Sequence, residues 1–201
     1  MPKYVDKDAR RREVAAALRR VAAREGLEAV SIRTVAAEAG LSAGAVQRDF
    51  ATKDELLAFA FHDTVAAVEE RFSRIRIGPG RATFAEGLRA VLLDLLPTDD
   101  ERRAQARVWA AFYARAALVP DFARTLADLD GRARTALRAA LSYASEQGEL
   151  APGLDPGAAV ELLLVLVDGI WLTAVRQPPG ASLDPQRAAV DAAVTAVTGT
   201  P

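Results

Sequence analysis

The chain has 201 residues, of which 51% are hydrophobic and 26% charged, enough apolar content for one domain or for a small domain joined to a larger one. Its formal net charge of -1 is unusual for a protein that coats nucleic acid, and the absence of cysteine excludes disulfides and thiolate metal sites. No signal peptide and no uninterrupted apolar run of about 18 residues is present, so we expect a cytoplasmic protein that does not enter membranes.

Residues 10–26 predict one amphipathic helix, because Val14, Leu18, Val21 and Ala22 fall on a single face. Residues 1–48 contain ten basic and six acidic side chains, whereas the remainder of the chain has a net negative charge. Five of the bases cluster near the start of this helix: Lys3, Lys7, Arg10, Arg11 and Arg12. They supply either salt-sensitive binding to phosphates or only a solvated helix end.

Residues 31–50 predict two short helices joined by a tight turn. Ser31 and Ser42 are suited to cap the two helices, and Gly40 is suited to end the first in a left-handed conformation. The apolar positions expected to be buried are Val35, Ala36, Ala39, Leu41, Val46 and Phe50. The positions expected to face outward are Arg33, Thr34, Gln47 and Arg48.

This spacing is typical of a helix-turn-helix, in which the second helix enters the DNA major groove. Its first turn carries the small residues Ala43 and Gly44, which let the helix backbone approach a groove closely. The alternative is an ordinary helical hairpin. The flanking sequence favours DNA binding, because Thr52 and Glu55 form a predicted capping box that places Lys53 at a helix N-terminus, where a phosphate is favoured.

The run from residue 8 to residue 62 resembles the N-terminal domain of TetR-type transcriptional regulators, which are named after the tetracycline repressor. The matching positions, in register and without a gap, are Gly26, Ser31, Arg33, Val35, Ala36, Ala39, Gly40, Leu41, Ser42, Gly44, Val46, Phe50, Lys53, Leu56 and Leu57. The resemblance implies an all-α protein of about nine helices. A three-helix head at residues 1–51, whose family domain extends to about residue 68, would precede a helical ligand-sensing and dimerisation domain at residues 52–201.

The motif and the resemblance together predict a surface that binds double-stranded DNA. Its predicted residues are Lys7, Arg11, Ser31, Arg33, Thr34, Ser42, Ala43, Gly44, Gln47, Arg48, Thr52 and Lys53. Two positions depart from the family pattern, which usually has tyrosine at Gln47 and histidine or tyrosine at Asp49. Gln47 is suited to hydrogen-bond an adenine edge. Asp49 disfavours a phosphate, so we expect it to point away or to pair with a base such as Arg48 or Lys53.

Beyond residue 57 the pattern stays helical. A long helix from residue 52 to about residue 74 should connect the head to the body and end at the Gly-Pro-Gly of residues 78–80. Capping boxes at Thr83 with Glu86 and at Thr98 with Glu101 predict the starts of two further helices, the first of which ends at Pro97. Another helix is expected from Pro120 to about residue 148.

Two C-terminal helices are expected, at residues 158–176 and from residue 184 onward. The first is apolar on most sides, so it needs covering on two faces, and a second copy of the chain is the natural partner. TetR-type proteins dimerise through such a helix pair, and the alternative is a core helix in a monomer. The predicted interface residues are Leu163, Val167, Ile170, Ala174, Val190, Val194 and Val197.

The body is predicted to hold a small effector among its middle helices. The predicted pocket residues are Trp109, Phe112, Tyr113, Phe122, Tyr143, Asp168 and Trp171, although aromatic residues at helical spacing also suit a plain core. Residues 109–117 and 168–172 resemble the C-terminal domain of the choline-responsive betaine repressor group, a likeness that does not carry a ligand with it. Arg115 and Asp168 are the charged residues of this region that need a partner if they are buried, and we expect them to pair with each other or with a helix end.

The predicted function is therefore a ligand-responsive repressor that binds a palindromic operator as a homodimer and is released by a small-molecule effector. An enzyme is disfavoured, because the chain has one histidine, His62, no Gly-rich phosphate loop and no helical metal-ligand pair, so no cofactor or metal is expected. The alternative function is a helical adaptor that binds protein instead of specific DNA.

Overall fold

The computed structural model describes residues 7–78, 80–178 and 180–199, and Lys3 of the predicted basic cluster lies outside them. The described residues form nine α-helices and one 3-10 turn, with no strand. The helices are α1 (Lys7–Glu25), α2 (Ile32–Glu38), α3 (Ala43–Asp49), α4 (Lys53–Phe72), α5 (Phe84–Asp94), α6 (Asp100–Ala116), α7 (Pro120–Glu146), α8 (Pro156–Arg176) and α9 (Asp184–Thr198), with the 3-10 turn at Leu27–Ala29. This confirms the all-α fold predicted from the sequence.

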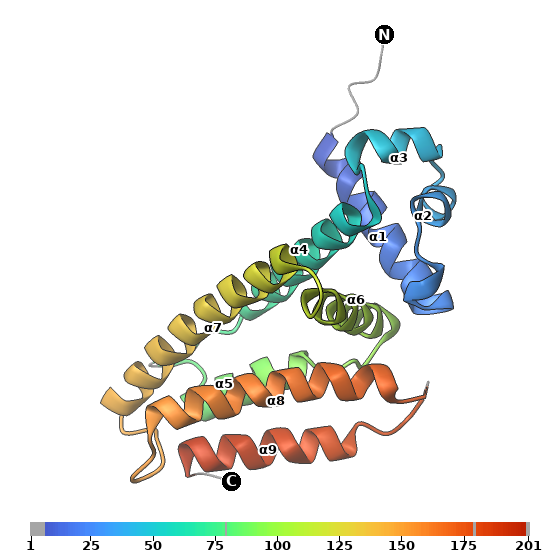
Figure 1. Cartoon of the computed structure of the whole chain (residues 1–201). Helices are drawn as coiled ribbons and strands as arrows, with labels where there is room; N and C mark the ends of the chain where they lie inside the picture. Colours follow the sequence, from blue (N-terminus) through green and yellow to red (C-terminus); the bar gives the residue numbers. More distant parts are fainter. Residues whose placement is uncertain (1–6, 79, 179, 200–201) are drawn as a thin grey trace.

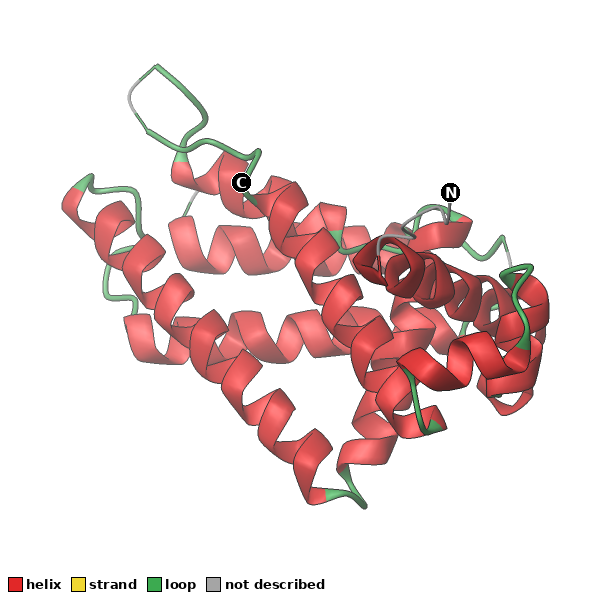
Figure 2. Ribbon diagram, turned by 90° about the horizontal axis from the view of Figure 1, so that it is seen from above, coloured by secondary structure: helices red, strands yellow, loops and turns green. Residues whose placement is uncertain are grey.

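The first three helices gather at one end of the molecule, and α4 runs from them into the body (Figure 1). Helices α8 and α9 lie side by side at the opposite end, and α5 packs on α9. Figure 2 shows the same helices from above, joined by short loops. The helical head and the helical body are thus connected through α4.

The predicted helix caps agree with the structure at most positions. The Thr83 hydroxyl accepts from the Glu86 backbone, and the Glu86 carboxylate accepts from the Thr83 backbone, which completes the predicted box. The box predicted at Thr98 is wrong, because Asp99 caps α6 by accepting from the Arg102 backbone at 2.8 Å. A carboxylate one residue later is the stronger partner for the free N–H groups.

The head has a core of its own. Val14, Leu18 and Val21 of α1 are fully or almost fully buried, as the predicted helix face requires, against Val35 of α2 and Val46 of α3. Leu41 is only partly buried, but it packs on the same cluster. These contacts fix α3 on α1 and α2 and set the direction in which its exposed face points.

A row of aromatic rings joins the head to the body. Phe61 of α4 stacks on Phe112 of α6 with ring centroids 3.8 Å apart, and it contacts Trp109 of α6 at 5.1 Å. Phe112 also meets Phe122 of α7 at 4.5 Å, and Trp109 stacks on Trp171 of α8 at 5.0 Å. Four helices therefore share one aromatic cluster.

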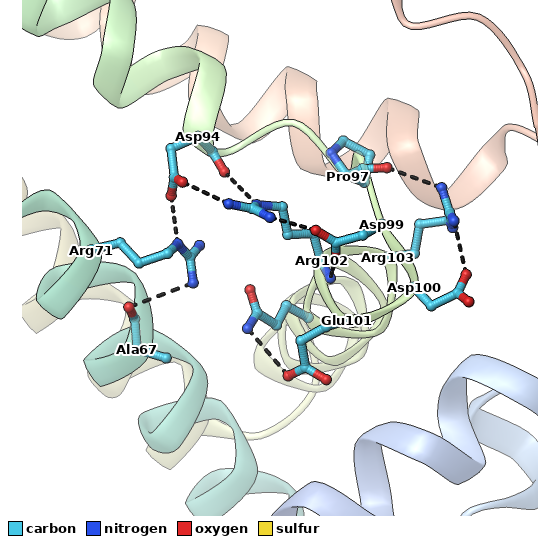
Figure 3. A network of polar contacts seen from close by, with 10 residues as sticks. Ala67, Arg71, Asp94, Pro97, Asp99, Asp100, Glu101, Arg102 and Arg103 are labelled. Carbon is cyan, nitrogen blue, oxygen red and sulfur yellow. Dashed lines mark hydrogen bonds and ion pairs between the residues drawn. The ribbon is translucent and has the colours of Figure 1, made fainter.

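A charged network fixes the far end of α4 to the body. Arg71 of α4 donates to Asp94 at the end of α5 at 2.5 Å, and Arg102 of α6 donates to the same carboxylate at 2.8 Å (Figure 3). Arg102 also pairs with Asp99, the cap of its own helix. The two arginines hold the pKa of Asp94 below its ordinary value against the opposing effect of its burial. The network thereby holds together the end of α4, the end of α5 and the start of α6.

By length and mean hydropathy alone, α8 is apolar enough to cross a membrane. In the fold it packs against α6, α7 and α9, with Trp171 and Leu163 almost fully buried. A core helix covered on several sides has the same composition.

We predict that Phe61→Ala destabilises the fold by about 3–5 kcal/mol, because it removes the ring that joins α4 to α6 and leaves a cavity. Urea unfolding followed by circular dichroism measures this loss. Phe59→Ala is the matched control, because Phe59 lies on the same helix and is only partly buried. An equal loss in the two variants would contradict a special role for the Phe61 stack.

Candidate nucleic-acid interface and body cavity

Helix α3 is exposed to solvent on one side and buried on the other. The Ser42 hydroxyl accepts from the Ala45 backbone N–H at 3.2 Å and begins the helix as predicted. Gly40, with φ of 66°, supplies the left-handed turn before it. The outward residues Ala43, Gly44, Gln47 and Arg48 are exposed, whereas Val46 is fully buried. Small residues at the start and longer polar ones after them suit insertion into a major groove.

Helix α2 lies beside α3, and its exposed side carries Arg33. Ser31 and Thr34 were predicted at the DNA surface, and the structure uses both for capping. The Thr34 backbone N–H donates to the Ser31 hydroxyl at 3.1 Å, and the Thr34 hydroxyl donates to the Ala29 carbonyl at 2.7 Å. Their first role is therefore to fix the start of α2.

Much of the basic charge of the head is neutralised within the head. Arg20 and Arg24 both pair with Glu38, at 2.8 and 2.9 Å. The guanidinium of Arg11 lies over the rings of Phe50 and Phe59 at 4.8 and 4.6 Å from their centroids, a cation–π arrangement that keeps its charge. Among the described residues, Arg12, Arg33 and Arg48 form no ion pair. Arg33 of α2 and Arg48 of α3 are exposed and therefore carry positive charge on the surface of the helix-turn-helix itself.

Asp49 has a structural role that the sequence did not reveal. Its side chain is 2% exposed, and Arg10 donates to both of its oxygens, from Nε at 2.6 Å and from Nη2 at 2.8 Å. This bidentate pair holds the pKa of the Asp49 carboxyl below its usual range. The prediction that Asp49 points away or pairs with a base agrees with the structure, but the base is Arg10 of α1 and not Arg48 or Lys53, because the end of α3 turns Asp49 inward onto α1. Asp49 therefore locks α3 to α1 and does not face DNA.

The start of α4 lies next to α3 and is tied to the body. The Thr52 hydroxyl accepts from the Glu55 backbone, but the Glu55 carboxylate accepts from Ala51 N–H at 2.8 Å instead of from Thr52, so the predicted box is completed one residue earlier. Arg115 of α6 donates to Asp54 at 2.5–3.1 Å. Arg115 therefore pairs with Asp54 and not with Asp168, the other charged residue expected to need a partner.

Other side chains join α6 to α1. Arg19 of α1 pairs with Asp63 of α4 at 2.6 Å and with Glu101 of α6 at 3.0 Å. Arg107 of α6 donates to the Ala23 carbonyl near the end of α1. Helix α6 thus contacts α1 near its own start and at its middle.

A cavity of about 460 Å³ opens between α4, α5, α6, α7 and α8. Three of the predicted pocket residues line it: Trp109, Asp168 and Trp171. Tyr113 lies behind the wall, where its hydroxyl donates to Asp168 at 2.7 Å. Burial raises the pKa of the Tyr113 phenol, and Asp168 raises it further, so the phenol keeps its proton and remains a donor.

The other predicted pocket residues do not line this cavity. Phe112 and Phe122 are packed in the aromatic cluster that joins the head to the body. Tyr143 is half-buried near the loop that contains Gly78. The sequence missed Asp130, Arg134 and most aliphatic residues of the wall, because helical spacing alone does not show which part of a buried face is left open.

The outer face of α8 and α9 differs from the predicted interface. All of the predicted interface residues except Val167 are buried inside the chain: Leu163, Ile170, Ala174, Val190, Val194 and Val197. They face the chain's own helices, because α6 and α7 cover one side of α8 and α5 covers one side of α9. The apolar residues left exposed on α8 are Leu162, Val165 and Leu172, which are 46%, 69% and 42% exposed.

Comparison with known proteins agrees with this architecture. The family model "Bacterial regulatory proteins, tetR family" matches residues 14–59, and "BetI-type transcriptional repressor, C-terminal" matches residues 84–199. The chain is 35% identical over 178 residues to HTH-type transcriptional regulator PksA of Bacillus subtilis (strain 168), which covers 89% of this chain and 84% of that protein. The chain belongs to the TetR family of bacterial transcriptional regulators.

Solved structures of similar fold span almost the whole TetR-family chain. A transcriptional regulator from Rhodococcus sp. Rha1 is 35% identical, with a TM-score of 0.79, and the match covers 95% of this chain and 99% of that one. A putative transcriptional regulator from Saccharomonospora viridis, solved in complex with choline, is 22% identical, with a TM-score of 0.79 over 92% and 95% of the two chains.

The family membership gives the head its function. Helices α2 and α3 form the helix-turn-helix of a TetR-family DNA-binding domain, which confirms the interpretation of residues 31–50. The matched families and relatives are regulators rather than enzymes.

We predict that Asp49→Asn lowers the melting temperature at pH 7, because Arg10 then loses a charged partner. A carboxyl with a depressed pKa contributes stability above its unfolded pKa of about 3.9, and that contribution is lost as the pH falls through its folded pKa. The difference between wild type and variant should therefore shrink below about pH 4. Differential scanning calorimetry from pH 7 to pH 3 measures it, and a difference that stays constant with pH would contradict the ion pair.

Proposed function

We propose that this TetR-family protein is a ligand-responsive repressor that acts in the cytoplasm, binds a palindromic operator as a homodimer and releases it when a small molecule fills the body cavity. The observation that carries the proposal is the link through α6, which borders the cavity with Trp109 and holds the start of α4 with Arg115. The DNA surface and the cavity are thus attached to the same helix.

The exposed apolar face of α8 supports the dimer. Leu162, Val165 and Leu172 recur at helical spacing, and α9, which packs on α8, exposes the small residues Ala188 and Ala192. Apolar side chains next to small ones allow close packing of a second helix pair, and a two-fold dimer uses the same patch on both copies. A four-helix interface of α8 and α9 from each copy follows.

A two-fold dimer presents two copies of α3 to DNA. Recognition helices that read successive major grooves on one side of the duplex lie about 34–36 Å apart, so the operator should be a palindrome with half-sites about one helical turn apart. Gln47 is the residue assigned to base edges. Arg33, Arg48 and Lys53 are assigned to the backbone phosphates.

Release follows from linkage between the two sites. A ligand in the cavity displaces side chains of α6, and α6 holds α4 through Arg115 with Asp54 and holds α1 through Arg107. A shift of α4 changes the separation of the two heads. The ligand weakens DNA binding only as far as it binds the released conformation more tightly. The choline complex of the Saccharomonospora viridis relative supports a ligand-holding body.

We predict that Gln47→Ala and Lys53→Ala have different effects on DNA binding. Gln47→Ala should relax the preference at particular base pairs by about 1–3 kcal/mol, because it removes contacts to base edges. Lys53→Ala should weaken binding to all sequences and lower the salt slope by about one.

Fluorescence anisotropy with operator and mutated duplexes at several salt concentrations separates the two effects. Gln147→Ala, at the exposed end of α7, is the control for the first variant, and Lys53→Arg is the control for the second. Wild-type behaviour of both alanine variants would contradict the docking of α3.

We predict that Leu162→Glu converts the dimer to a monomer, because an unpaired carboxylate in an apolar interface costs several kcal/mol. Light scattering after size exclusion measures the mass. Leu118→Glu is the matched control, because Leu118 is 79% exposed but lies in the turn between α6 and α7. A dimer that persists in Leu162→Glu would place the interface elsewhere.

A further inference from the structure

We propose that the cavity binds an organic cation with a large apolar body, an assignment that rests on the proposed role of the body as the effector domain. The cavity combines a long aliphatic wall, two tryptophans and two carboxylates that form no ion pair with a described residue. The aliphatic wall suits the apolar body of such a ligand, and the carboxylates and tryptophans suit its positive charge.

The wall of the cavity is mostly aliphatic and aromatic. Its apolar residues come from five helices and include Val68, Phe72, Leu88, Leu92, Leu137 and Leu163. A cavity of about 460 Å³ lies within the range of small-molecule sites, which bury most of a ligand against apolar side chains. A small, fully hydrated cation would leave this wall uncovered, so the ligand needs an apolar body.

The charged residues of the cavity leave an excess of negative charge. Six charged side chains line it, and four of these form two ion pairs. Arg134 donates to Glu161 at 2.8 and 3.1 Å, and Arg132 lies 3.7 Å from Glu69. The other two are Asp130 and Asp168, which form no ion pair with any described residue.

The charge of Asp168 on α8 acts on Asp130 of α7, and both residues line the cavity. Burial raises the pKa of the Asp130 carboxyl and the negative charge of Asp168 raises it further, and the positive charge of Arg134 opposes these effects without cancelling them. The ionised form of Asp130 is therefore disfavoured both by its burial and by the charge of Asp168. A bound cation relieves both, whereas a bound anion adds a third negative charge.

The aromatic residues favour the same ligand. Trp109 and Trp171 both line the cavity, and tryptophan faces attract organic cations more strongly than other side chains do. Trp171 is 2% exposed, and its indole N–H has no hydrogen-bond acceptor among the described residues. The Tyr113 hydroxyl donates to Asp168 and keeps this carboxylate oriented beside the indoles. The indole N–H of Trp109 also has no acceptor there, so a polar group of the ligand that accepts from either tryptophan would satisfy a free donor.

The test uses intrinsic fluorescence, because the chain contains two tryptophans and both line the cavity. The probes are tetraphenylphosphonium and tetraphenylborate, which share a shape and an apolar surface but carry opposite charges. Choline serves as a cation without a large apolar body. We expect fluorescence quenching that saturates with the phosphonium at a concentration at least tenfold lower than with the borate or choline.

Two variants test the assignment to residues. Asp130→Asn and Asp168→Asn should each weaken phosphonium binding by about tenfold, since each removes one of the two negative charges. Asp128→Asn is the matched control, because Asp128 lies on the same helix and borders a smaller, adjoining hollow beside His62 but does not line the cavity itself. It should bind the phosphonium as wild type does. Circular dichroism of each variant checks that the fold is retained.

The outcomes separate this inference from the proposed function. Equal or tighter binding of the borate, or wild-type affinity in both carboxylate variants, would overturn the inference, even if another compound released DNA. Saturable, carboxylate-dependent binding of the phosphonium supports it. Operator binding is measured in the same samples by fluorescence anisotropy. If the phosphonium binds but operator affinity is unchanged, the proposed effector mechanism is contradicted, whereas the inference of a cation-binding cavity is still supported.

Discussion

The packing of α6 against α4 is the contact on which the rest of the structure depends. Phe61 and Phe112 stack at 3.8 Å in the middle of this contact, and the stack continues through Trp109 to Trp171 at the cavity wall. Close-packed rings do not deform gradually, so a change at one end of the row is passed on as a shift of helices. Arg115 with Asp54 adds a charged link at the start of α4, beside α3.

The head was largely predictable from the sequence, because its signals are local. Ser31, Gly40 and Ser42 define helix ends by capping and turn geometry, and the period of apolar residues identifies the buried faces. Asp49 was not predictable, because its partner Arg10 is 39 residues away and only the packing of α3 on α1 brings the two together. The capping error at Thr98 arose because Asp99 next to it is also a good cap.

The sequence predicted the helices of the body, but it did not predict which of their faces are buried, which are exposed and which line the cavity. An almost wholly apolar helix such as α8 does not reveal which side its own chain covers, so the interface residues were assigned to faces that are buried inside the chain. The cavity likewise depends on where five helices fail to meet. Nothing in the local sequence separates Asp130, on the cavity wall, from Asp128 two residues earlier. Tertiary packing alone makes that distinction.

The measurement that tests the account most directly is selection of random duplex DNA on the purified protein at moderate salt, followed by sequencing of the enriched pool. A dimer with two α3 helices should enrich a palindrome with half-sites about one helical turn apart. Enrichment should be lost in the Leu162→Glu monomer. If a folded and dimeric protein enriches no sequence, the account is contradicted, and the helix-turn-helix is a structural element that does not bind DNA specifically.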